Sequence, residues 1–224
     1  MSVQSLLDQL LKSAGTSLGS VQQAATGSEM GKYATGAALG GVLGLLLGSR
    51  GGRRMGSQAL KYGSVAAIGA LAWKAYQDHQ VQQRTQADSA AAPATAAPPI
   101  FASLPAPQME MHSRAMLKAM IAAARADGHM DDRERDLVEA EIARLEGDPA
   151  IRSWVDIELR RPVEPADVAA AASGPEMAAE IYLASLLVVD QTTTMERAYL
   201  DELARQLRLA DGLKAELEAR AAAA

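Results

Sequence analysis

A glycine-rich apolar run from Tyr33 to Ser49 constrains this chain more than any other segment, because it contains no charged residue. As a helix it would be roughly 25 Å long, close to the lower limit for crossing a hydrocarbon core about 30 Å thick. Glycine costs about 1 kcal/mol relative to alanine inside a soluble helix, so the run is poorly suited to water. It is therefore predicted to associate with a membrane, as a helix or a hairpin.

The glycines of this run recur every four residues, which places them on one face of a helix. Small residues at this spacing let two helix backbones approach closely in lipid. We therefore expect a glycine zipper that drives self-association into a homo-oligomer, formed by Gly36, Gly40, Gly44 and Gly48.

Basic residues follow the run and are predicted to contact lipid head groups, namely Arg50, Arg53, Arg54 and Lys61. By the positive-inside rule, a single span would leave them and the domain after them in the cytoplasm. A second helical stretch at 57–77 has too few consecutive apolar residues to span comfortably, and is expected to be interfacial or the return arm of a hairpin. If both stretches span, the C-terminal domain moves to the far side.

The composition divides the chain into four parts. Residues 1–32 hold a short amphipathic helix and a loop, 33–77 the membrane-associated region, 78–109 a Gln/Ala/Pro-rich linker, and 110–224 a helical domain. The N-terminal helix is expected either to pack on its own chain or a second copy, or to bind a membrane or a partner. In the last part apolar residues recur at helical spacing, and the segment after Pro175 is almost wholly apolar. The fold class is therefore predicted to be all-α, with a buried central helix.

Charge differs between the two halves of the chain. Residues 1–111 carry eight Lys/Arg and five Asp/Glu, whereas residues 112–224 carry fourteen and twenty-two. An acidic domain lacks the basic face that phosphate contacts need, so no nucleic-acid partner is expected. The chain contains no cysteine, which excludes disulfides, thiolate metal sites and a cysteine nucleophile.

The acidic segment ADGHMDDRE at 126–134 lies between two predicted helices of the C-terminal domain. Gly128 is expected to end the first helix, because glycine readily adopts the left-handed conformation found there. Asp131 and Glu134 form a capping-box pattern that would open the second helix.

A related pattern follows at 189–196. There Thr193 and Glu196 would supply the capping box, and Asp190 corresponds to Asp127. The domain is therefore predicted to contain two related helix–turn–helix halves.

Carboxylates in these turns are also candidate ligands for a divalent metal ion. The spacing does not match an EF-hand, because His129 and Val138 stand where a calcium loop needs an oxygen ligand and a glutamate. In the alternative interpretation the carboxylates cap a helix and face solvent. No Ser/His/Asp set or phosphate loop can be assembled, so no catalytic residue is assigned. The candidate metal ligands are Asp127, Asp131, Asp132, Glu134 and Asp190.

The turn at 126–128, followed by acidic capping residues, resembles the recurrent motif of the TerB-like helical domain, named for a tellurite-resistance protein. The whole layout is similar to that of bacterial inner-membrane proteins of the YebE type. This resemblance implies an acidic, metal-binding face, a link to envelope stress or tellurite tolerance, and no established catalysis. In the second half Gln191 replaces the glycine and Arg197 stands in the place of Glu134, which argues against a symmetric two-site metal centre.

Two functional hypotheses follow. The first is a non-enzymatic interaction module of the bacterial inner membrane, whose cytoplasmic helical domain recruits a protein partner on the linker. The second is a divalent-metal sensor whose acidic turn closes on an ion.

Overall fold

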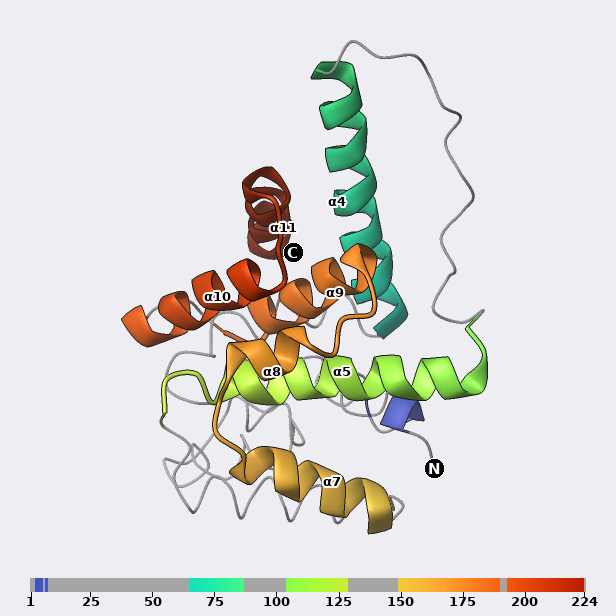
Figure 1. Cartoon of the computed structure of the whole chain (residues 1–224), viewed down its shortest axis with the longest axis vertical. Helices are drawn as coiled ribbons and strands as arrows, with labels where there is room; N and C mark the ends of the chain where they lie inside the picture. Colours follow the sequence, from blue (N-terminus) through green and yellow to red (C-terminus); the bar gives the residue numbers. More distant parts are fainter. Residues whose placement is uncertain are drawn as a thin grey trace, which may run out of the picture.

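The computed structural model describes residues 3–5, 7, 65–86, 104–128, 149–189 and 193–223. Every regular element within these ranges is a helix, so the all-α prediction is confirmed for them (Figure 1). The glycine run and the basic residues after it lie outside the described residues, as does most of the acidic segment.

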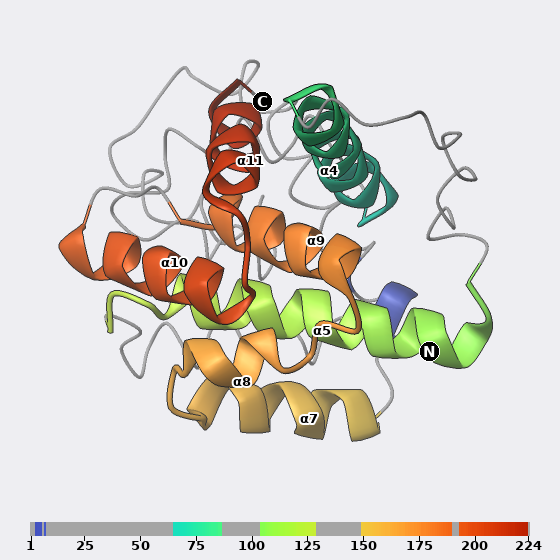
Figure 2. The same ribbon diagram turned by 45° about the horizontal axis from the view of Figure 1, so that its top comes forward.

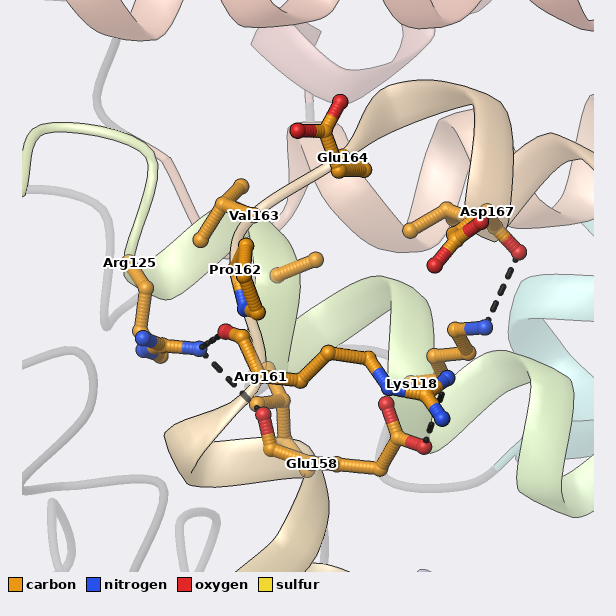
Figure 3. A pocket seen from close by; sticks show the side chains of 11 residues that line it. Lys118, Arg125, Glu158, Arg161, Pro162, Val163, Glu164 and Asp167 are labelled. Atoms are coloured by element: carbon orange, nitrogen blue, oxygen red, sulfur yellow. Dashed lines mark hydrogen bonds and ion pairs between the residues drawn. The ribbon is translucent and has the colours of Figure 1, made fainter.

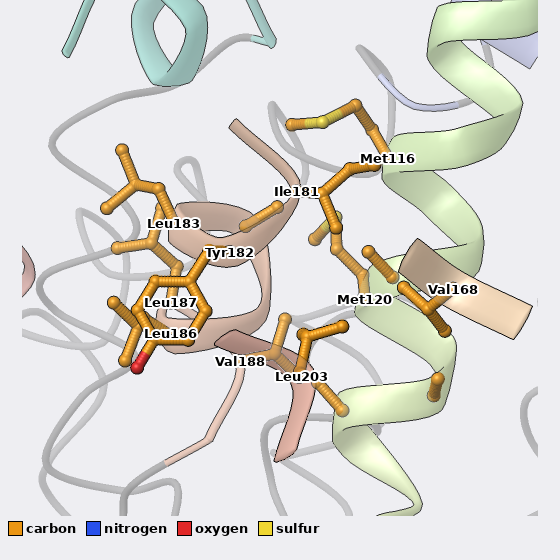
Figure 4. Packing of buried hydrophobic residues seen from close by; sticks show 14 of the residues in the cluster. Met116, Met120, Val168, Ile181, Tyr182, Leu183, Leu186, Leu187, Val188 and Leu203 are labelled. Carbon is orange, nitrogen blue, oxygen red and sulfur yellow. The ribbon is translucent and has the colours of Figure 1, made fainter. Parts of the chain in front are cut away.

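Helix α9 (Pro175–Leu186) is the centre of the bundle, as its apolar sequence predicts. Ile181 is fully buried, and α9 contacts four other helices. Proline suits its first turn, where a backbone N–H has no helical partner. On one side α9 packs along α5 (Ala106–Ala124), from which Met116 and Met120 reach toward Ile181 (Figure 4).

The remaining helices surround α9 and α5. Helices α4 (Val65–Gln86) and α11 (Asp211–Ala223) lie beside each other and both contact α9 (Figure 2). Helix α10 (Thr194–Gln206) contacts α9, α5 and the short α8 (Pro165–Ala169), and α7 (Pro149–Arg160) packs on α5.

The position of α4 differs from the sequence-based expectation. The sequence assigned residues 57–77 to the membrane-associated region and began the linker at residue 78. In the structure α4 continues to Gln86, and its apolar side is buried in the bundle. The two assignments use the same feature, because a stripe of small apolar residues fits a helix interface in protein as well as in lipid.

The start of the chain also packs on the bundle. Val3 and Leu7 are 0% and 1% exposed, and the Val3 amide donates a 2.9 Å hydrogen bond to Glu110 Oε2 at the start of α5. For these residues, the interpretation that the N-terminal helix packs on its own chain is confirmed.

Among the described helices, none is both long enough and apolar enough to cross a membrane. The segment predicted to meet the bilayer, at 33–49, lies outside the described residues.

Two predicted helix boundaries are confirmed. Gly128, at φ 72°, adopts the left-handed conformation just after α5. Thr193 and Glu196 form a complete capping box at the start of α10, with each side chain accepting the other residue's backbone N–H.

The end of α10 is a Schellman motif with an unusual residue at its left-handed position. The amide of Leu209 donates to the carbonyl of Ala204, and that of Arg208 to Arg205, as this motif requires. Arg208 has φ 55°, a conformation that is unfavourable for a residue with a Cβ atom.

We therefore expect Arg208→Gly to raise the free energy of unfolding by about 0.5 kcal/mol. Relief of the left-handed strain, worth about 1–2 kcal/mol, outweighs the extra entropy that glycine brings to the unfolded chain. Gly128→Ala is the matched opposite change and should lower the free energy of unfolding by about 1 kcal/mol. Urea unfolding followed by circular dichroism measures both, and a destabilised Arg208→Gly variant would contradict this interpretation.

Candidate functional site

The contact of α4 with the rest of the bundle joins distant parts of the chain, and we call it the α4 seat. Ile68, Ala72 and Ala75 are at most 2% exposed and lie on one side of α4, at spacings of four and three residues. This side packs against α9 and α11. Since two of the three residues are alanines, the helices can approach closely.

A buried pair of ionisable side chains lies beneath α4. Nε2 of His112 on α5 is 2.5 Å from Oε2 of Glu180 on α9, and the two side chains are 12% and 15% exposed. Gly69 of α4 faces this pair, because a Cβ atom at Gly69 would lie 3.4 Å from Oε1 of Glu180. Three helices therefore meet around one carboxylate.

Arg220 on α11 connects α11 to α4. Its guanidinium lies 2.5 Å from the Asp78 carboxylate and 2.8 Å from that of Glu216, and it also reaches the Leu71 carbonyl. Burial lowers the pKa of Arg220, but the hydrogen bonds to Glu216 and Asp78 raise it by more. The side chain is 17% exposed, so water competes little for these contacts.

The two helices approach most closely where α11 begins. A Cβ atom on Gly212 would lie 2.8 Å from Cε1 of His79 on α4, which is too close for an unshifted side chain. Glycine at this position therefore lets the His79 imidazole lie against the α11 backbone.

Polar contacts also tie α11 to the central helices. The Tyr182 hydroxyl of α9 donates a 2.8 Å hydrogen bond to Glu218, and Lys214 bridges Glu218 to Asp201 on α10. Burial raises the pKa of Tyr182 above its usual range, and the bond to Glu218 raises it further. The helix that holds α4 is thus itself fixed to α9 and α10.

A small cleft lies between the ends of α5 and α7 and the start of α8 (Figure 3). Its charged side chains serve helix ends: Arg125 donates to the carbonyls of Glu158 and Arg161, and Lys118 donates to that of Asp167. The free volume is about 10 Å³, room for about one water molecule and far below that of a ligand pocket. The cleft therefore stabilises helix ends.

The structure describes one of the five predicted metal ligands. Asp127 is half-buried in the turn after α5, next to Gly128, whose Cβ would lie 4.0 Å from Met195 on α10. Asp131, Asp132, Glu134 and Asp190 lie outside the described residues, so the metal site stays a prediction. Among the residues that are described, no group of three or more His, Cys, Asp or Glu could hold a metal ion.

The residues of the α4 seat were missed by sequence reasoning. Glu216 and Arg220 stand four residues apart, which indicates a pair along one helix, but Asp78 is 142 residues from Arg220 and no local pattern joins them. The predicted zipper glycines and head-group residues lie outside the described residues.

We predict that Arg220→Met weakens the α4 seat and lowers the free energy of unfolding by about 1 kcal/mol, because Asp78 loses a charge-assisted hydrogen bond. Arg205→Met is the matched control, since Arg205 makes equally short contacts to Glu202 within exposed α10. Urea unfolding of the full chain should show a smaller loss for the control. Equal losses would mean that Arg220 does not fasten α4.

Comparison with known proteins assigns the chain to a family. A relative from Yersinia enterocolitica, "Uncharacterized protein in ampR 5'region", is 26% identical over 107 residues, which make up 46% of this chain and 74% of the relative. No solved structure matches. Residues 32–221 match the family described as "Protein of unknown function (DUF533)", which is TerB-like, in agreement with the resemblance of the turn at 126–128. Because this match covers most of the sequence, the chain belongs to the DUF533 family.

Proposed function

We propose that this protein is a membrane-anchored, non-enzymatic interaction module of the bacterial inner membrane. The apolar run at 33–49 provides the anchor, its glycine face provides self-association, and the helical bundle provides the surface for a protein partner. The charge-free run and the basic residues after it support the membrane location. The likeness to YebE-type proteins supports a role in envelope or tellurite-type stress.

The observation that carries this proposal is the α4 seat. Only residues 50–64 separate the apolar run from α4, which is packed into the bundle. The bundle is therefore held close to the lipid surface, rather than at the end of the linker that the sequence suggested. A short basic connection of this kind favours a domain that works at the head-group level.

The polar contacts described above also favour a binding module over an enzyme. Arg125 and Lys118 serve helix ends, and Arg220, Glu218 and Lys214 join helices to one another. These groups hold the fold in place, which is what a scaffold for a partner requires.

Replacing Gly40 and Gly44 by isoleucine tests the self-association. Bulky side chains on the glycine face would keep two helices apart, so chemical cross-linking of the full chain in membranes should lose the oligomer. The matched control is Ala38→Ile with Val42→Ile, which adds bulk on the opposite helix face and should leave cross-linking intact.

Cross-linking that survives in the Gly40 and Gly44 variant, with the chain still in the membrane fraction, would overturn the glycine-face part of the proposal. A wild-type chain that stays soluble after cell fractionation would overturn the anchor.

A further inference from the structure

Both flanks of the apolar run pack on the same helical body. On the N-terminal side, Leu7 is 1% exposed and the Val3 amide is bonded to Glu110 of α5. On the C-terminal side, Ile68 of α4 is 2% exposed against the bundle. Residues 8–64 therefore leave one folded body and return to it (Figure 1).

Between these two anchor points only one stretch is long and apolar enough to cross a bilayer. Residues 8–32 are interrupted by charges, including Asp8, Lys12 and Glu29, and residues 50–64 carry four basic residues. The number of crossings between the anchor points is therefore one or none.

A single crossing is incompatible with the packing of the two flanks. It would place Leu7 and Ile68 on opposite sides of the membrane, whereas both are buried in one bundle. To keep the crossing, the chain would have to expose Val3 and Leu7 to water or detach α4 from α9 and α11, which uncovers apolar surface in either case.

We propose that the run at 33–49 attaches to the membrane from one side without crossing it. The N-terminus, the basic residues and the bundle then share one face of the membrane. The inference rests on the proposed membrane anchor and replaces a spanning segment by a one-sided attachment.

The charges on the two flanks agree with a one-sided attachment. Lys32 precedes the run directly, and Arg50, Arg53 and Arg54 follow it. With both ends at the same leaflet, all of these cations meet the head groups of one surface, and anionic lipid there would favour binding through both flanks.

Thiol labelling of the full chain tests the topology, and the absence of native cysteine makes it clean. A flexible Gly/Ser extension carrying one cysteine is placed before Met1 in one variant and after Ala224 in another. Each is expressed in bacteria and treated with a membrane-impermeant maleimide, in spheroplasts and in inverted inner-membrane vesicles. Detergent-solubilised samples confirm that both thiols react.

We expect the two cysteines to be modified in the same preparation and protected in the other. Modification of one cysteine in spheroplasts and of the other in inverted vesicles would show a crossing and overturn the inference, while leaving the anchor intact. A chain that is missing from the membrane fraction would overturn the anchor itself, and the inference with it. The two failures are thus distinguished by fractionation before labelling.

Discussion

The packing of α4 against α9 and α11 joins the first part of this chain to its C-terminal domain. The contact combines small apolar residues, which allow a close approach, with the buried guanidinium of Arg220 between two carboxylates. Because α11 is bonded to α9 and α10 through Glu218 and Lys214, a force on α4 reaches the centre of the bundle. The proposed membrane location of the bundle and the one-sided attachment both depend on this contact.

The Ala/Pro-rich sequence after α4 acquires a different meaning in this arrangement. A linker between an anchor and a domain would let the domain move away from the lipid. Here the helices on either side of that sequence, α4 and α5, both contact α9. The sequence therefore connects two parts of one packed body, and the distance of the bundle from the apolar run is set by residues 50–64.

Local features of the fold could be predicted from the sequence. Gly128 and the Thr193–Glu196 capping box depend on neighbouring residues alone, and the structure confirms both. The central position of α9 follows from its apolar composition. The α4 seat could not be predicted, because Ile68, Ala72 and Ala75 form a stripe that suits lipid and protein equally, and because Asp78 and Arg220 are joined only by the tertiary fold. The metal-site prediction depends on carboxylates of which only Asp127 is described.

Amide hydrogen exchange of the full chain in lipid vesicles tests most directly whether α4 is part of the bundle. If it is, the central amides of α4 should exchange with the same opening free energy as those of α9, since both open in one cooperative event. Protection of α9 together with rapid exchange throughout α4 would show that α4 folds and moves independently. That result would contradict the α4 seat as described, and with it the arguments for a bundle held at the membrane and for a one-sided attachment.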